Sequence, residues 1–178
     1  MKISVFGGSQ PREGEAAYLQ AIQLGRFLAQ RGHIVMTGGY IGTMEAVSRG
    51  ASKAGGHVIG VTCLEIERWR SGGANRWVNE EWKEPSLIRR LERLVTECDA
   101  ALALPGGPGT LTEICMLWNL MIIEALHRRP LILIGGGWRS VFDQVFTGLA
   151  HYSSPAQNGL LRFAPDVETA VQMLEPSA

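Results

Sequence analysis

Short apolar runs alternate with longer amphipathic segments along almost the whole chain. Each run is apolar nearly throughout, which is typical of a strand covered on both faces of a sheet. We expect five such strands, at residues 2–6, 33–37, 57–62, 100–104 and 130–134. A sixth run, "LLRFA" at residues 160–164, predicts a further strand near the end of the sequence.

Helical periodicity fits between these runs. The expected helices cover residues 15–30, 42–54, 86–97, 110–127 and 139–149, and Asp166 is placed to cap a last helix. Because strands and helices alternate, the sequence predicts an α/β fold with a doubly wound, Rossmann-like parallel sheet and helices on both faces. With 178 residues, 46% of them hydrophobic, the chain is predicted to form one domain over residues 1–178.

The segment at residues 63–84 fits this alternation least well. It carries Trp69, Trp77 and Trp82 together with several charged side chains. Three interpretations stay open for it: a lid, a strand with a loop, or part of an interface.

Charge and cysteine usage narrow the class of protein. Seventeen basic and seventeen acidic side chains cancel, and no run of like charge favours nucleic acid or a membrane surface. The N-terminal "MKISVFGG" reaches glycine too early for a secretion signal or a membrane span. Cys63, Cys98 and Cys115 lack the spacing of a zinc site, and no histidine has a partner at metal-ligand spacing. We therefore expect a cytoplasmic protein with reduced, mostly buried thiols and no bound metal.

Glycine concentrates where the predicted strands end. Because the carboxyl ends of parallel strands share one rim of the sheet, these turns are expected to meet where open α/β sheets bind ligands. Tight turn geometry alone is the alternative explanation for any single turn. The turn residues are Gly7, Gly8 and Ser9 after the first strand, Gly38, Gly39, Gly42 and Thr43 after the second, Pro105, Gly106, Gly107, Gly109 and Thr110 after the fourth, and the glycines at 135–137 after the fifth.

The turn at residues 105–110 favours a phosphate or nucleotide site. A phosphate needs several backbone N–H groups within reach, and a Cβ atom would block that approach. The N-terminus of the next helix adds unpaired N–H groups and a partial positive charge, and Thr110 adds a hydroxyl. The P-loop motif and the G-x-G-x-x-G dinucleotide fingerprint are both absent from the sequence. The sequence therefore predicts a phosphate grip built mainly from backbone, and it disfavours ordinary NAD chemistry.

Two side chains near this turn are candidates for chemistry. Glu113 follows Thr110 by three residues, the spacing of a capping box in which the two side chains satisfy backbone donors. A catalytic carboxylate beside the phosphate turn is the other interpretation of Glu113. Arg90 lies at the edge of the apolar stripe of the helix at 86–97, so it is the arginine there best placed to reach inward. Snorkelling over that stripe is the alternative for Arg90.

The predicted helix at residues 110–127 is apolar nearly all the way round. In a chain of this length, a second subunit is the expected cover for its second apolar face. The sequence therefore predicts a homodimer that forms through this helix.

The stretch "PGGPGTLTE" at residues 105–113 resembles the P-G-G-x-G-T-x-x-E signature of the LOG family. These proteins are the cytokinin riboside 5′-monophosphate phosphoribohydrolases, which are often mislabelled lysine decarboxylases. "VFGGS" is similar to the first glycine turn of the family. "TGGYIGTMEAVSRGASKAGGHVIGV" is similar to its second turn, the helix that follows and the third strand.

The resemblance implies a Rossmann-like dimer that hydrolyses the N-glycosidic bond of AMP or N6-modified AMP without a metal or an organic cofactor. The essential glutamate of the family falls on Glu113 and its essential arginine on Arg90. Arg90 is expected to orient Glu113 and to keep it ionised, because a nearby positive charge lowers a carboxylate pKa. The base is expected toward the helix that bears Leu94, closed over by the tryptophan-rich segment.

The sequence departs from the family at several positions. Leu91 stands where the family has a lysine, and "GTME" at residues 42–45 replaces Gly-Leu-Met-Gly. The alternative function is a non-catalytic nucleotide-binding protein that resembles molybdenum-cofactor carriers. A pyridoxal-dependent decarboxylase is disfavoured, because no lysine lies in a glycine turn.

Overall fold

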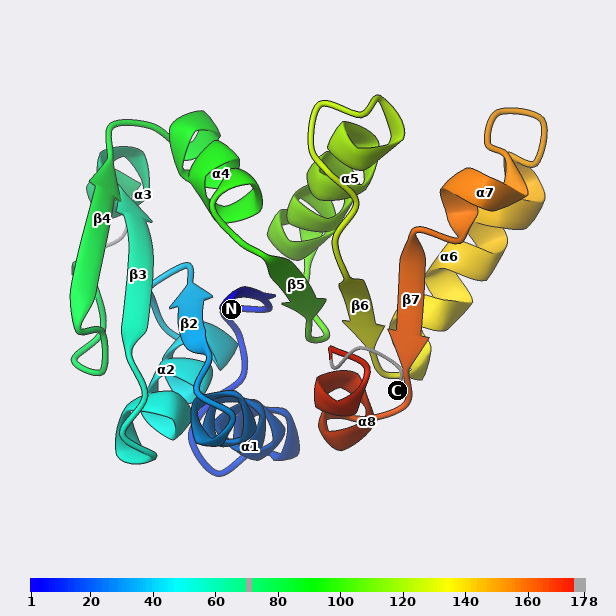
Figure 1. The fold of residues 1–178 in the computed structure, drawn as a ribbon. Helices are drawn as coiled ribbons and strands as arrows, with labels where there is room; N and C mark the ends of the chain where they lie inside the picture. The colour runs from blue at the N-terminus through cyan, green and yellow to red at the C-terminus, as the bar shows by residue number, and fades with distance from the viewer. Residues whose placement is uncertain (70–71, 175–178) are drawn as a thin grey trace.

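The computed structural model describes residues 1–69 and 72–174. In this part of the chain seven parallel strands form one sheet in the order β4-β3-β2-β1-β5-β6-β7 (Figure 1). The six expected strands are all present, and the predicted doubly wound α/β fold is confirmed. The strands are β1 (Lys2–Phe6), β2 (Ile34–Thr37), β3 (Val58–Cys63), β4 (Glu80–Glu84), β5 (Ala100–Ala103), β6 (Leu131–Ile134) and β7 (Leu161–Ala164).

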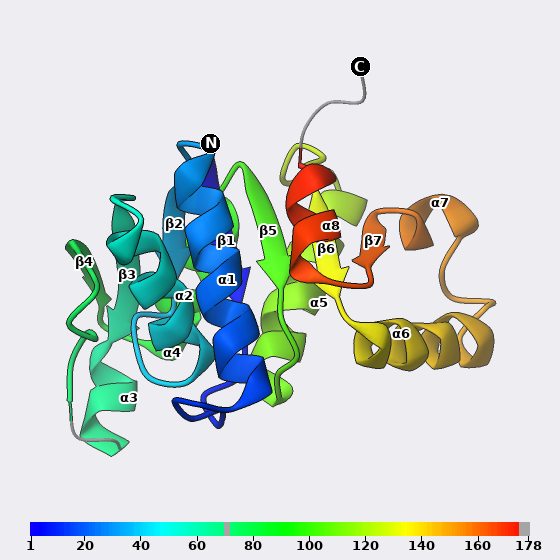
Figure 2. The same cartoon turned by 90° about the horizontal axis from the view of Figure 1, so that it is seen from below.

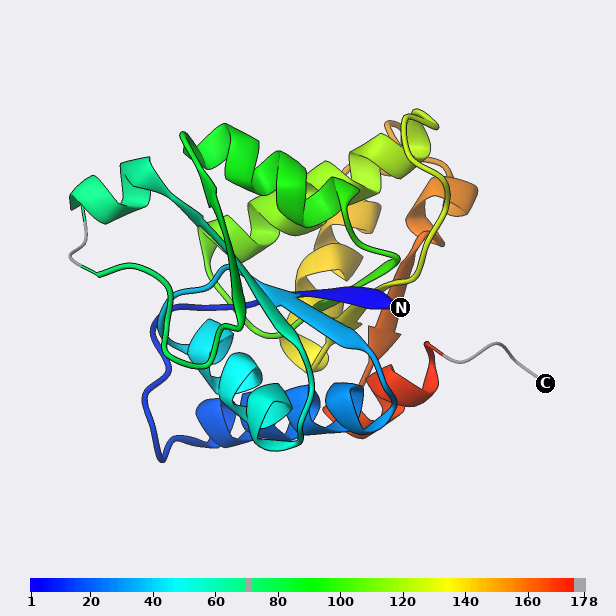
Figure 3. The same cartoon turned by 60° about the vertical axis from the view of Figure 1, so that its left-hand side comes forward.

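Helices cover both faces of the sheet. The core on one face lies under α1, α2 and α8, and the core on the other lies under α4, α5 and α6 (Figures 2 and 3). Strands β3, β5 and β6 are buried at every position, which explains their continuous apolar runs. The helices are α1 (Ala16–Gln30), α2 (Thr43–Lys53), α3 (Leu64–Trp69), α4 (Leu87–Thr96), α5 (Pro108–Ile122), α6 (Gly136–Gly148), α7 (Pro155–Asn158) and α8 (Val167–Gln172).

Two predicted helices have wrong boundaries. Helix α5 begins at Pro108 and ends at Ile122, five residues before the expected end at 127. Glu124 takes a left-handed φ of 56°, a conformation that commonly terminates a helix. Helix α6 begins at Gly136 because two of the three glycines at 135–137 enter its first turn.

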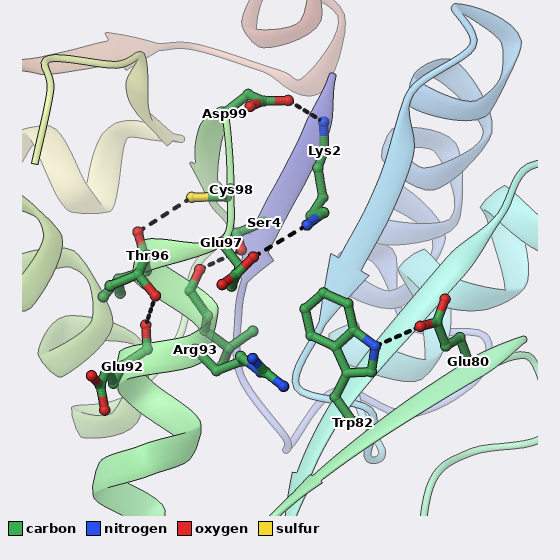
Figure 4. A network of polar contacts seen from close by, with 12 residues as sticks. Lys2, Ser4, Glu80, Trp82, Glu92, Arg93, Thr96, Glu97, Cys98 and Asp99 are labelled. Atoms are coloured by element: carbon green, nitrogen blue, oxygen red, sulfur yellow. Dashed lines mark hydrogen bonds and ion pairs between the residues drawn. The ribbon is translucent and has the colours of Figure 1, made fainter.

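The segment at residues 63–84 contains a short helix, α3, and an edge strand, β4. The sequence of β4, "EEWKE", is too polar to be recognised from an apolar run. Trp82 anchors β4 through two cations (Figure 4). The Lys2 Nζ atom of β1 lies 4.9 Å from the centroid of the Trp82 ring, and the Arg93 Cζ atom of α4 lies 4.7 Å from it. The indole N–H donates to Glu80, 2.6 Å away. Charged side chains along an edge strand discourage pairing with another sheet, so this composition suits its position.

The order of the strands creates a crevice at the carboxyl ends of β1 and β5. From β1 the chain moves outward through β2, β3 and β4, and it then returns to β5 on the other side of β1. Connections leave in opposite directions at such a point, so the space above it stays open. Backbone hydrogen bonds join the turns around it: the Gly8 N–H donates to the Pro105 carbonyl (3.3 Å), and the Thr43 N–H donates to the Gly8 carbonyl (2.9 Å).

Thiols and metal-type side chains are dispersed. Cys63, Cys98 and Cys115 are free, and the first two are buried. Across residues 1–69 and 72–174, no group of three or more His, Cys, Asp or Glu side chains is arranged to hold a metal ion. Over the same ranges, every helix is too short or too polar to cross a lipid bilayer.

Helices α1 and α2 approach closely because each contributes a glycine. A Cβ atom on Gly25 of α1 would lie 2.0 Å from the Val47 carbonyl oxygen. A Cβ atom on Gly50 of α2 would lie 2.0 Å from the Ile22 carbonyl oxygen. The contacts are with backbone, which cannot move aside as a flexible side chain does. This packing supports the turns that enter and leave β2.

Gly25→Ala is therefore expected to lower the free energy of unfolding by about 1–3 kcal/mol through overpacking. Urea denaturation followed by circular dichroism measures the change. Gly148→Ala is the matched control, because a Cβ atom there meets no other atom within 4 Å. The control should change stability by less than about 1 kcal/mol, and equal stabilities for the two variants would contradict the prediction.

Candidate active site

A pocket of about 390 Å³ occupies the crevice. Its two sides differ in chemistry. The β1–β5 side is lined by turn residues, namely Gly7, Gly8, Ser9, Gln10, Gly107, Pro108, Gly109 and Thr110. The β2–β3 side is lined by larger side chains, namely Tyr40, Met44, Ile66, Trp69 and Leu87. Arg90 of α4 and Glu113 of α5 complete the lining.

The turn after β5 presents bare backbone to the pocket. Added Cβ atoms on Gly107 and Gly109 would meet nothing within 4 Å, so the space beside both is open. Gly107 is the N-cap of α5 and provides no side-chain cap, and Pro108 follows at the first helical position. The N–H groups of Gly109 and Thr110 therefore face the helix N-terminus without intrahelical partners. This arrangement can hold an anion through backbone donors and the helix dipole.

The capping-box interpretation of Glu113 is wrong. The helix begins two residues earlier than expected, so Thr110 is its third residue and not its N-cap. Glu113 lies one turn further along, is 7% exposed and lines the pocket. Its carboxylate is therefore available for chemistry inside the pocket.

Arg90 pairs with Glu113 in the lining of the pocket. The Arg90 Nη1 atom lies 3.7 Å from Glu113 Oε1, and Arg90 is 6% exposed. Its Nε donates to the Val61 carbonyl (2.8 Å) and its Nη2 donates to the Gly38 carbonyl (3.2 Å). The guanidinium carbon lies 5.6 Å from the Tyr40 ring centroid. The inward orientation predicted from the helical period is present, and the snorkelling alternative is wrong.

The carboxyl of Glu113 does not behave as the sequence predicts. Burial raises its pKa from 4.5 to about 7, and the opposing effect of Arg90 is smaller. A charged carboxylate loses its hydration in the pocket, and an arginine 3.7 Å away compensates only part of that loss. Arg90 does lower the pKa of Glu113, as the sequence predicts, but burial outweighs this effect, so Arg90 does not keep the carboxyl fully ionised at neutral pH. Near neutral pH, the protonated and ionised forms of Glu113 are both populated.

Several predicted site residues support the pocket without lining it. The Thr43 hydroxyl donates to the Gly8 carbonyl, 3.0 Å away, so it is already used. Gly38 leaves room for Arg90, because a Cβ atom there would lie 2.0 Å from Nη2. Gly39 accepts from the Asn75 backbone N–H at 2.7 Å.

The other supporting residues hold the turns together. Gly42 approaches the β1 turn, where a Cβ atom would lie 2.5 Å from the Gly8 carbonyl oxygen. Pro105 accepts the hydrogen bond from Gly8. Gly106 makes room for the Thr110 hydroxyl, which would lie 2.1 Å from a Cβ atom.

The sequence predicted the side-chain wall of the pocket only in part. The helix that bears Leu94 lines the pocket through Leu87 and Arg90, while Leu94 itself is fully buried in the core. The tryptophan-rich segment at residues 63–84 contributes Trp69 to the lining. Tyr40 and Met44 belong to the second glycine turn and its helix, where the glycines give the recognisable pattern and these two side chains do not. Ile66 and Trp69 come from α3, which is too short to give a periodic signal.

Comparisons with known proteins show the family of the chain. A sequence model described as the SLOG cluster4 family matches residues 1–123, more than half of the chain. The chain therefore belongs to this family, and the resemblance to the LOG family is confirmed.

The relatives include plant enzymes. The chain is 35% identical over 136 residues to the probable cytokinin riboside 5′-monophosphate phosphoribohydrolase LOGL5 of Oryza sativa subsp. japonica. That match covers 75% of this chain and 53% of the relative, so the chain spans about half the length of the rice protein. It is 29% identical over 180 residues to the cytokinin riboside 5′-monophosphate phosphoribohydrolase LOG7 of Arabidopsis thaliana, covering 98% of this chain and 81% of the relative.

A solved structure shares the fold along almost its whole length. The molybdenum cofactor binding protein of the phototrophic bacterium Rippkaea orientalis superposes with a TM-score of 0.75 at 25% identity. The match covers 98% of this chain and 96% of that chain. The same architecture is thus found in a protein whose name describes binding, not hydrolysis.

The raised pKa of Glu113 predicts a pH-dependent stability. Between pH 4.5 and 7 the folded protein binds more protons at this site than the unfolded chain, so the free energy of unfolding falls as pH rises. Well below pH 4.5 the carboxyl is protonated in both states, so it does not lower the free energy of unfolding. The lowering develops as pH rises and is complete about one pH unit above 7. The amide of Glu113→Gln does not titrate. From pH 4.5 to pH 8, the free energy of unfolding of the wild type should therefore fall by about 3 kcal/mol more than that of Glu113→Gln.

Urea titrations at the two pH values measure this difference. The control is Glu168→Gln, which removes an exposed carboxylate from the first turn of α8. Its stability should follow that of the wild type at both pH values. A Glu113→Gln variant that also follows the wild type would show that Glu113 has an ordinary acidity.

Proposed function

We propose that this chain hydrolyses the N-glycosidic bond of a purine nucleoside 5′-monophosphate, AMP or an N6-modified AMP, to the free base and ribose 5-phosphate. The observation that carries the proposal is one buried carboxylate, Glu113, paired with Arg90 inside a pocket that is also lined by glycine backbone. The relatives named as phosphoribohydrolases support the same assignment.

The glycine turns would hold the 5′-phosphate. The N–H groups at the start of α5 and the open backbone of Gly107 and Gly109 provide donors without a lysine. The turn residues Gly7, Gly8 and Ser9 face the same space from the end of β1. A phosphate there places the ribose toward Glu113, which lies one helical turn beyond Thr110 on α5.

Glu113 would act on the sugar carbon. As the bond from C1′ to the base nitrogen breaks, positive charge develops on the ribose, and an ionised carboxylate stabilises it. Glu113 also accepts a proton from the water that forms the new bond to C1′. The electron pair of the broken bond stays on the base nitrogen, which takes up a proton. In the overall reaction, one nucleotide and one water molecule give one free base and one ribose 5-phosphate.

The acidity of Glu113 suits this role. A group with a pKa of about 7 both accepts and donates a proton at neutral pH. Arg90 is held by two backbone carbonyls, so it keeps a fixed positive charge beside the carboxylate. Arg90 therefore orients Glu113 and limits how far burial raises its pKa.

A non-catalytic carrier is the second candidate function. The similarity to the Rippkaea orientalis molybdenum cofactor binding protein favours it, since that fold covers nearly all of this chain. The same backbone grip would then hold the phosphate of a bound cofactor without turnover. Glu113 would have no reaction to serve, and its replacement would leave the function of the protein intact.

We further propose that two copies of the chain associate through α5. Ile123 and Leu111 are 62% and 37% exposed along this helix. Cys115 lies on the same exposed stripe. A second copy would cover these apolar side chains.

Glu113→Gln is expected to lower the rate of AMP hydrolysis by at least about 100-fold, because the amide cannot accept a proton or neutralise a cation. AMP affinity should stay within a few-fold, since the phosphate grip is unchanged. Release of adenine is followed by chromatography and binding by calorimetry. For the wild type, kcat/KM should rise with pH through an apparent pKa near 7, because the ionised form is the active one.

Glu92→Gln is the matched control, a half-buried glutamate on α4 that pairs with Arg89 outside the pocket. It should retain wild-type turnover. Tight AMP binding with no adenine released by the wild type would contradict the hydrolase and favour the carrier.

Ile123→Glu is expected to convert a dimer to a monomer, because it places a charge in the proposed interface. Sedimentation velocity measures the mass. Leu149→Glu is the control: Leu149 is 51% exposed and caps the end of α6 as Ile123 caps the end of α5. A wild-type monomer, or an Ile123→Glu dimer, would overturn the assignment.

A further inference from the structure

Trp69 presents its indole ring at the mouth of the pocket. It is 82% exposed, although tryptophan usually buries much of its surface. Ile66 precedes it by three residues on α3, a spacing that places both side chains on one face of a helix. Both line the pocket, on the side opposite the glycine turns. The chain thus displays an aromatic face toward the space that a ligand would enter.

Helix α3 is tied to the rest of the fold on its other sides. The Glu65 carboxylate accepts a hydrogen bond from the Leu87 N–H, 2.8 Å away, at the start of α4. The Glu67 carboxylate lies 3.1 Å from the Lys83 ammonium of β4. These two contacts hold the short helix in place beside the pocket. The helix that carries Trp69 is therefore anchored at two points beside the pocket, at the start of α4 and on β4.

The wall around Trp69 has few groups that can read the edge of a base. Met44, Ile66 and Leu87 are apolar. The Tyr40 hydroxyl donates to the Cys63 carbonyl (3.1 Å) and accepts from the Cys63 N–H (2.8 Å), so its donor is already committed. Arg90 and Glu113 pair with each other, and the other polar side chains of the lining, Ser9, Gln10 and Thr110, come from the glycine turns.

Building on the proposed function, we infer that Trp69 and Ile66 bind the face of the nucleobase, so that the site selects a flat purine by stacking and not by its hydrogen-bonding edge. The phosphate turns and this wall lie on opposite sides of the pocket, with Arg90 and Glu113 completing its lining. A nucleotide spanning the pocket would then bring its glycosidic bond to the ion pair.

This mode of recognition has a consequence for specificity. AMP and IMP differ at the six-position, where an amino donor is replaced by a carbonyl acceptor. A site built to bond that edge rejects the wrong partner by several orders of magnitude, whereas stacking tolerates every base with a similar face. AMP and IMP are therefore expected to bind within about tenfold of each other. CMP, with a smaller ring, should bind more weakly than both.

The test measures binding of AMP, IMP, CMP and ribose 5-phosphate by calorimetry, using the Glu113→Gln protein so that no ligand is consumed. Trp69→Ala should weaken AMP and IMP by about tenfold and leave ribose 5-phosphate within twofold. Trp69→Phe should restore most of the loss. Tyr152→Ala, which removes an 85% exposed aromatic ring outside the pocket, is the matched control and should change nothing.

Two results would overturn the inference. One is an equal change, or no change, in the affinities of AMP and ribose 5-phosphate in Trp69→Ala. The other is a preference for AMP over IMP of 1000-fold or more in the parent protein.

These failures are distinct from failure of the proposed function. Binding that follows the expected pattern, with no adenine released by the wild type, would refute the hydrolase and keep the stacking wall. AMP hydrolysis with an unchanged KM in Trp69→Ala would keep the hydrolase and refute the wall. A raised KM with nearly unchanged kcat in that variant would support both.

Discussion

The structure depends on one buried arginine. Arg90 is a residue of α4. Its guanidinium donates to backbone carbonyls of β3 and of the turn after β2, and it pairs with the Glu113 carboxylate of α5. A guanidinium in so little water is tolerated only because several groups share its charge. Those groups come from three elements, and Arg90 itself comes from a fourth. Their meeting point is the crevice that the strand order opens beside β1.

The glycines around this point serve two different purposes. Some make room for neighbouring side chains: Gly38 for the Arg90 guanidinium, and Gly7 and Gly106 for the hydroxyls of Thr43 and Thr110. Among the glycines that line the pocket, Gly107 and Gly109 face open space, so they leave backbone free for a ligand. A glycine-rich rim is therefore mostly packing, with a small bare patch at the start of one helix. The division also explains why mutating different glycines here should affect different properties.

The sequence predicts the parts of the molecule whose local pattern reflects their burial. Strands covered on both faces appear as apolar runs. The signature at residues 105–113 locates the glycine turn and Glu113 in the lining of the pocket. Strand β4 was left open because an edge strand has little apolar surface to hide. The raised pKa of Glu113 was not predicted, because the spacing shows the nearby charge but not how completely water is excluded. The wall made by Ile66 and Trp69 depends on contacts between α3, β4 and α4, which no local pattern encodes.

The position of β1 also constrains how the protein is made. It is synthesised before the other six strands of the sheet, yet it lies between β2 and β5, and Ile3 pairs with Ala100. Its second neighbour is not synthesised until more than half of the chain exists. Until then the nascent sheet has an open apolar edge at its future centre, a state prone to wrong pairing. The late arrival of β5 closes that edge, and the residues that follow it, up to Glu113, complete the crevice, so the pocket is incomplete in every shorter nascent chain.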